Sequence, residues 1–212
     1  RGDLDSKPYT HLEFQNDPDN FQFAVIGDRT GGGRKGVLSS AVDLMNLLQP
    51  EFALSVGDFI EGYDSNKKVL ESQWKVMDEV LKPLSMPLFF VPGNHDLNFD
   101  PSEEVWFNRV GTKRSYSHFV YKNVLFLLLS TEDPPKRNPP KELLEKYDQL
   151  KAGQITDPKE AKEAVAELEE WAGAINISDA QVEYFKKTIS DNPDVRWTIA
   201  FMHSPAWIAP DP

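Results

Sequence analysis

The chain has 212 residues, of which 40% are hydrophobic and 27% charged, a composition typical of an ordinary soluble globular protein. Its formal net charge of -11 argues against broad binding to nucleic-acid backbones, which requires a basic surface. It contains no cysteine, which excludes disulfides, thiolate zinc sites and cysteine nucleophiles, and no apolar run is long enough to cross a bilayer.

The first half of the chain alternates short apolar runs with helical patterns. The apolar runs span residues 21–26, 52–56 and 87–91, and residues 37–48 and 67–84 between them carry apolar side chains at helical spacing. This order of strands and helices predicts a parallel sheet with right-handed crossovers, so the expected fold class is α/β.

The second half of the chain continues the mixed pattern and includes an insertion. In order, we predict a short helix at 102–109, a hairpin of residues 115–121 and 124–130, a helical insertion at about 132–177, a helix capped by Ser178 and a buried strand at 195–202. The insertion is either a solvated helical pair packed on the core or a lid, because long insertions are often functional. Residues 1–212 are expected to form a single domain.

Polar side chains follow four of the predicted strands. In chain order they are Asp28, Asp58, the segment Asn94-His95-Asp96, and His203. Functional groups of parallel α/β sheets lie beyond the carboxyl ends of the strands, so we expect these side chains to converge at one edge of one sheet. Each alone could be a turn residue, a helix cap or a core histidine. Together, carboxylate, amide and imidazole groups are suitable ligands for divalent metals, and Asp58 could bridge two ions.

These strand ends resemble a known signature. In order, Gly27-Asp28, Gly57-Asp58 with Glu61, Gly93-Asn94-His95-Asp96 and Met202-His203 resemble the motifs of the calcineurin-like metallophosphoesterase family. The predicted hairpin at 116–131, followed by a helix and the strand before His203, resembles its purple acid phosphatase branch. The resemblance implies a four-layer α/β/β/α sandwich around a binuclear centre. It also implies metal-dependent hydrolysis of a phosphate monoester or diester. Oxygen and nitrogen ligands admit manganese, iron, zinc, nickel or magnesium, so the identity of the two divalent ions is left open.

The resemblance further implies roles for the metal-binding residues. Asp28 would be a ligand of the first ion, Asp58 would bridge the two ions, and Asn94 and His203 would bind the second ion. The family usually has a histidine at the position of Thr30, and this departure favours an alternative, a catalytically impaired domain that binds a ligand or a partner. The family also ends its site with a Gly-His-x-His segment that would lie beyond Pro212, so the domain is expected to be incomplete at its C-terminus.

The remaining site residues would act on the substrate. The resemblance implies that His95 protonates the leaving oxygen or steadies the transition state, and that Asp96 holds its ring in the correct tautomer. Asn94 and Arg29 are the candidates for binding the phosphate, although Arg29 could equally form a surface ion pair.

A competing interpretation comes from the glycine-rich run at residues 31–36, which fits the G-x-G-x-x-G pattern with Asp58 as the following acidic residue. It would make the chain a dinucleotide-binding oxidoreductase. Two observations argue against it: the glycines begin too late after the strand, and Asp28 would repel a pyrophosphate.

The opening of the chain bears on location. The polar segment at residues 6–20 resembles a mature N-terminal arm after removal of an export signal, which favours a periplasmic or secreted protein and leaves the cytoplasm open. The identity of the substrate and the oligomeric state are left open as well.

Overall fold

The structure is a computed structural model that describes residues 20–30, 33–135, 138–173 and 175–206. Residues 6–19 of the opening segment, two glycines of the run 31–36 and Pro212 lie outside the described residues. The expectations about an export signal and about the C-terminal end therefore concern parts of the chain that the structure does not describe, whereas Gly33, Gly36 and Asp58 of the dinucleotide fingerprint are described.

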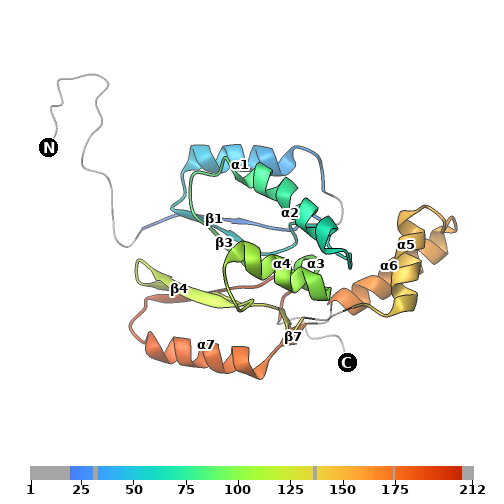
Figure 1. Ribbon diagram of the computed structural model, residues 1–212. Coiled ribbons are helices and arrows are strands. Elements are labelled where there is room, and N and C mark those ends of the chain that lie inside the picture. Colours follow the sequence, from blue (N-terminus) through green and yellow to red (C-terminus); the bar gives the residue numbers. More distant parts are fainter. Residues whose placement is uncertain (1–19, 31–32, 136–137, 174, 207–212) are drawn as a thin grey trace, which may run out of the picture.

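The described residues form a four-layer sandwich, with two sheets face to face between layers of helices (Figure 1). The strands are β1 (Phe23–Ile26), β2 (Phe52–Ser55), β3 (Leu88–Phe90), β4 (Ser117–Tyr121), β5 (Val124–Leu128) and β8 (Trp197–Phe201). The first sheet is parallel with the order β1-β2-β3. The second has the order β4-β5-β8, with β4 antiparallel and β8 parallel to β5. The predicted α/β/β/α sandwich is confirmed.

The helices form the two outer layers. Helices α1 (Val37–Leu48), α2 (Lys67–Leu81) and α4 (Asp100–Val110) cover the first sheet, and α7 (Asp179–Asp191) covers the second. The one-turn helix α3 (Asn94–Leu97) follows β3 directly. No helix in the described part of the chain has the length and apolarity that a membrane crossing requires.

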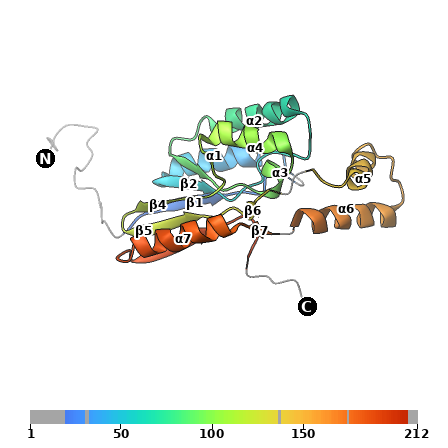
Figure 2. The ribbon, with the colours of Figure 1, turned by 60° about the horizontal axis from the view of Figure 1, so that its bottom comes forward.

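The insertion stands apart from these layers. It contains α5 (Lys141–Lys151) and α6 (Pro158–Gly173), and it is closed by the parallel pairing of β6 (Glu132–Asp133) with β7 (Asn176–Ile177). In Figures 1 and 2, α5 and α6 project from the end of the sandwich at which α3 lies.

Helix boundaries follow from local chemistry. Asn66 and Ser178 precede α2 and α7 and accept hydrogen bonds from the backbone N of Lys68 and Gln181, so each caps free N–H groups of its helix. The predicted Ser178 cap is therefore confirmed. The helix predicted at 67–84 ends earlier, at Leu81.

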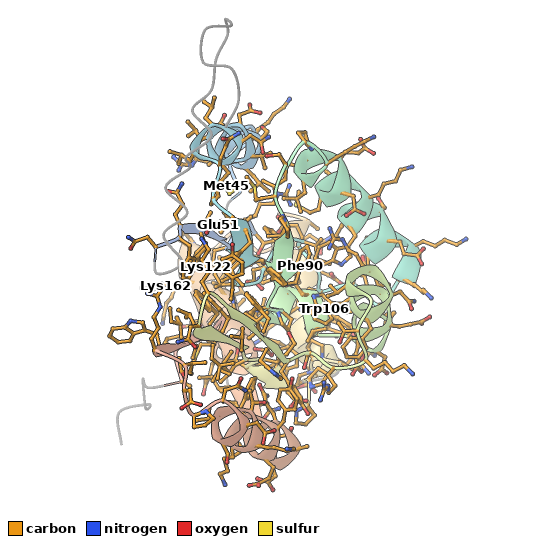
Figure 3. The ribbon with its side chains drawn as sticks, turned by 90° about the vertical axis from the view of Figure 1, so that its left-hand side faces the viewer. Met45, Glu51, Phe90, Trp106, Lys122 and Lys162 are labelled. Carbon is orange, nitrogen blue, oxygen red and sulfur yellow. The ribbon has the colours of Figure 1, made fainter. Side chains whose placement is uncertain are left out.

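Three apolar layers hold the sandwich together. The first, between the helices and the first sheet, includes Met45, Trp74 and Trp106, and Figure 3 shows Phe90 of β3 near Trp106 of α4. The second lies between the two sheets and is rich in phenylalanine, with Phe119 and Phe126 stacked at 4.8 Å between ring centroids. The third joins the second sheet to α7. All five residues of β5 are buried because both faces of that strand are covered.

The last strand corrects one prediction. We expected the strand that precedes His203 to lie in the same sheet as the first three strands, but β8 pairs with β5 in the second sheet. The reason is that an apolar run shows only that a strand is buried, and it carries no information about its hydrogen-bonding partner. His203 consequently reaches the sheet edge from the opposite layer.

The hairpin between β4 and β5 is confirmed and helps to join the two sheets. Its turn residues Lys122 and Asn123 have φ values of 44° and 61°, as a two-residue hairpin turn requires. The Lys122 ammonium lies 3.2 Å from the Glu51 carboxylate at the start of β2, and Figure 3 shows the two side by side. This contact lies at the opposite end of the strands from the polar strand ends.

Candidate metal centre

The backbone brings the first two polar strand ends together. Asp28 and Asp58 follow β1 and β2 in left-handed conformations, with φ values of 51° and 60°. The backbone N of Asp28 donates to the Gly57 carbonyl at 3.1 Å, and the backbone N of Arg29 donates to the Asp58 carbonyl at 3.0 Å. These bonds fix the loop after β1 against the loop after β2.

Two glycines permit the loop after β2 to approach the loop after β3. A Cβ atom on Gly57 would lie 2.4 Å from the backbone N of Gly93, and a Cβ on Gly93 would lie 2.1 Å from Asp58 Oδ1. Gly57 also has a φ of 98°, a backbone conformation that residues other than glycine rarely adopt. The Gly-Asp and Gly-Asn-His-Asp segments therefore need their glycines for close contact between the loops.

The structure brings the four predicted metal-binding residues to one place. Asp28, Asp58 and His203 each offer a ligand atom, and these atoms all lie within 4.8 Å of one another. His203 Nε2 lies 3.4 Å from Asp58 Oδ2 and 3.0 Å from Asn94 Oδ1. The side chains of Asp58 and His203 are only 8% and 10% exposed, whereas Asp28 is exposed, so the cluster is buried at Asp58 and His203 and open to solvent at Asp28.

The donor set of this cluster fits a divalent cation. His203 Nδ1 lies 2.8 Å from the Val56 carbonyl and donates its hydrogen there, so Nε2 faces two oxygens that can only accept. Acceptors this close need a proton or a cation between them. Burial lowers the pKa of His203, but the hydrogen bond and charge of Asp58 and the Val56 carbonyl outweigh it and raise that pKa to about 9. A metal ion can take the place of this proton among the same atoms.

His95 lies at the rim of the cluster. Its backbone N donates to Asp58 Oδ1 at 3.0 Å, and its ring Nδ1 lies 2.6 Å from the Glu61 carbonyl. Its Nε2 lies 3.9 Å from Asp58 Oδ2, and its side chain is 18% exposed. The ring is thus held at Nδ1 and presents Nε2 to the site and to solvent.

The predicted contact between Asp96 and the His95 ring is wrong. Asp96 Oδ2 accepts hydrogen bonds from the backbone N of Asp58 at 2.9 Å and of Gly93 at 3.0 Å. Adjacent residues of a helix point about 100° apart, so Asp96, the third residue of α3, turns back onto the helix start while the His95 ring points away. The Glu61 carbonyl fixes the ring instead. Burial and the charge of Asp58 raise the pKa of Asp96 to about 6.

Tyr63 is a site residue that the sequence analysis missed. Its hydroxyl accepts a hydrogen bond from Asn94 Nδ2 at 2.9 Å, and its ring meets the His95 ring edge-on at 4.7 Å between centroids. Burial raises the pKa of Tyr63 to about 12. The sequence signal was weak, because a tyrosine five residues after Asp58 has no recognised spacing to a metal ligand.

The structure places Arg29 and Thr30 beside the cluster. Arg29 Nη1 donates to the Phe59 carbonyl at 3.2 Å, so within the described residues its partner is a carbonyl and not a carboxylate. Arg29 lines a cavity of about 410 Å³ together with Asp28 and Arg34. The backbone N of Thr30 donates to the Asp58 carbonyl at 3.2 Å.

Comparisons with known proteins agree with this geometry. The model of the calcineurin-like phosphoesterase family matches residues 21–211. Among solved structures, the chain is similar to a dimetal phosphatase from Danio rerio, with a TM-score of 0.58 and 13% identity over 87% of this chain and 70% of that chain. At 13% sequence identity, this structural similarity supports the fold alone. The comparison with curated proteins gave no match. The chain therefore belongs to the calcineurin-like phosphoesterase family and is a metal-dependent hydrolase of phosphate esters.

Proposed function

We propose that this chain hydrolyses a phosphate monoester or diester at a centre of two divalent metal ions. In this proposal Asp28 and Asp58 bind one ion, and Asp58, Asn94 and His203 bind the other. The observation that carries it is the convergence of Asp28, Asp58 and His203 within 4.8 Å, with Asn94 Oδ1 3.0 Å from His203 Nε2. Ions held there would acidify a water molecule and stabilise charge on the phosphoryl oxygens.

His95 acts on the leaving group in this proposal. Because its Nδ1 hydrogen is engaged by the Glu61 carbonyl, Nε2 is the ring atom that can carry a proton to the leaving oxygen. The backbone N of His95 donates to Asp58 Oδ1, so the ring is fixed relative to the bridging carboxylate.

Arg29 binds the phosphate in this proposal. Arg29 directly follows Asp28 and lines the same cavity, so its guanidinium brings a positive charge to the loop that carries Asp28. A guanidinium can donate two parallel hydrogen bonds to phosphate oxygens, which favours this role over a surface ion pair.

Removal and replacement of metal tests the proposal. Para-nitrophenyl phosphate and bis(para-nitrophenyl) phosphate are the monoester and diester probes. We expect chelation to abolish turnover of at least one probe, and manganese, zinc, iron, nickel or magnesium to restore it. The Asp58→Asn variant should stay inactive at every metal concentration. The matched control is Asp191→Asn, which removes a carboxylate paired with Lys187 on α7. Turnover that survives chelation would contradict the proposal.

A further inference from the structure

The helical insertion packs against the body of the protein through an apolar cluster. Its members are Tyr63, Phe99, Leu144, Tyr147, Leu168 and Trp171, four of which belong to α5 and α6. The Tyr63 ring lies 5.8 Å from the Tyr147 ring and 6.5 Å from the Trp171 ring, measured between centroids. Tyr63 is only 7% exposed, so the insertion is part of what buries it.

The other side of Tyr63 faces the metal centre. Its hydroxyl accepts from Asn94 Nδ2, and the Asn94 amide therefore turns its oxygen toward His203 Nε2. A side-chain amide has one oxygen and one NH₂ group, and only the oxygen can bind a metal ion. The partner of the NH₂ group thus selects the orientation that a metal needs.

The backbone at Tyr63 is constrained as well. Tyr63 has a φ of 46°, a left-handed conformation that is uncommon for a bulky residue and persists only where its surroundings enforce it. The preceding Gly62 lies so close to α3 that a Cβ there would be 1.9 Å from the His95 carbonyl oxygen. The Tyr63 N–H donates to Asn98 Oδ1 at 3.3 Å. These contacts fix the tyrosine between the insertion and the helix that carries Asn94 and His95.

We propose that Tyr63 is a positioning residue that couples the α5–α6 insertion to the metal centre. Its hydroxyl holds the Asn94 oxygen toward the metal, and Tyr147 and Trp171 hold its ring in place. This inference rests on the proposed function, because it takes Asn94 as a ligand. It assigns the insertion a role in metal affinity, beyond that of a solvated helical pair.

The first experiment removes the hydroxyl alone. Tyr63→Phe keeps the ring contacts, and its affinity for Mn²⁺ is measured by calorimetric titration of the metal-free protein. We expect a loss of about 10–100-fold, the usual effect of removing a partner of a metal ligand. The matched control is Tyr184→Phe, which removes a hydroxyl 2.6 Å from His118 Nδ1 on the second sheet. An affinity of Tyr63→Phe equal to that of the control would overturn the inference.

The second experiment tests whether orientation is the cause. Asn94→Asp replaces the amide by a carboxylate, which presents an oxygen in either orientation. Adding Tyr63→Phe to Asn94→Asp should therefore leave the Mn²⁺ affinity of that variant unchanged. An equal loss in both backgrounds would mean that Tyr63 acts in some other way, and the inference would fail.

The third experiment tests the insertion. Trp171→Leu removes the aromatic contact with Tyr63, and we expect a smaller loss of Mn²⁺ affinity that does not add to the loss in Tyr63→Phe, because the two residues act through the same ligand. Unchanged Mn²⁺ affinity in Trp171→Leu, or a loss that adds fully to that of Tyr63→Phe, would mean that the insertion does not act on the metal centre through Tyr63.

The variant Asp58→Asn distinguishes a failure of the proposed function from a failure of the inference about Tyr63. If Asp58→Asn binds Mn²⁺ as tightly as the parent chain, the proposed function fails. If Asp58→Asn loses affinity but Tyr63→Phe binds Mn²⁺ as tightly as the parent chain, only the inference about Tyr63 fails.

Discussion

Among single residues, Asp58 contacts its neighbours in the site through both carboxylate oxygens and through its backbone. One carboxylate oxygen accepts from the backbone N of His95, and the other lies 3.4 Å from His203 Nε2. Its carbonyl accepts from the backbone N of Arg29, and its own N–H donates to Asp96 Oδ2. Asp58 thus joins the loops after β1, β2 and β3 to the histidine from the second sheet.

We predict that Asp58→Ala empties both metal positions, because it is the only ligand that we assign to both ions. Elemental analysis of the purified variant should show bound manganese or zinc reduced at least about tenfold relative to the parent chain, since direct ligands matter at least as much as their partners. Asp191→Ala on α7 serves as the control. Unchanged metal content in Asp58→Ala would remove Asp58 from the centre.

His95→Ala should spare metal binding and reduce turnover. The variant keeps the backbone N that donates to Asp58 Oδ1, so the carboxylate keeps its partner. The expected loss of kcat is on the order of 10²–10⁴-fold, the usual contribution of a general acid or base. The loss should be smaller for para-nitrophenyl phosphate than for an alkyl phosphate, whose leaving group needs a proton. Equal losses for both substrates would show that His95 is not the acid.

At the residue scale the sequence predicted which side chains gather, but not how they are held. Asp28, Asp58, Asn94 and His203 were found because each follows an apolar run, and a strand end is a local property of the sequence. The carbonyls that fix His203 and His95 belong to Val56 and Glu61. Every residue has a backbone carbonyl, so the sequence does not indicate which carbonyl binds a histidine ring. For that reason the sequence-based prediction that Asp96 fixes the tautomer of His95 was wrong.

At the scale of elements, the site depends on how closely three loops pack. The loops after β2 and β3 touch at Gly57 and Gly93, and one-turn helix α3 brings Asn94 and His95 back toward Asp58. The strands and the hairpin were predictable because they are apolar runs with clear ends. Helix α3 and the pair β6–β7 were missed because elements of two to four residues have no periodicity to detect, and β6 pairs with a strand more than 40 residues away.

Gly93→Ala tests this packing. Gly93 has an ordinary φ of -108°, so an alanine there adds no backbone strain, but its Cβ would lie 2.1 Å from Asp58 Oδ1. We expect the free energy of unfolding to fall by about 1–3 kcal/mol, as for overpacking, together with a loss of metal affinity. Gly111→Ala is the control: its Cβ would meet nothing within 4 Å, and its φ of +73° adds strain away from the site. Equal metal affinity in Gly93→Ala and Gly111→Ala would contradict the dependence of the metal centre on close packing at Gly93.

At the scale of the whole molecule, the two sheets meet at their polar ends as well as through their apolar faces. His203 from the second sheet contacts Asp58 and the Val56 carbonyl from the first. Metal binding at this seam should therefore stabilise the sandwich as a whole, since a ligand that binds only the folded state shifts the folding equilibrium toward it.

The protonation of His203 gives a pH test on the metal-free protein. Its folded-state pKa is raised from 6.5 to about 9, so the contribution of its protonated form to stability is fully present below pH 6.5 and is lost as the pH rises through 9. The free energy of unfolding should fall by about 3 kcal/mol over this range. His203→Asn should remove most of this fall, and bound metal should remove it too. Denaturant titrations between pH 6 and 9 measure the effect, and a flat profile in the metal-free parent would contradict it.

The most direct test of a binuclear metal centre bridged by Asp58 is to locate the bound metal ions. Crystals grown with Mn²⁺ should give anomalous difference peaks at the ends of β1, β2 and β3, one beside Asp58 Oδ2, Asn94 Oδ1 and His203 Nε2 and a second between Asp28 and Asp58. Peaks at both positions would support a binuclear centre bridged by Asp58. A protein that binds Mn²⁺ in solution but shows its anomalous peaks only away from Asp58 would contradict the account.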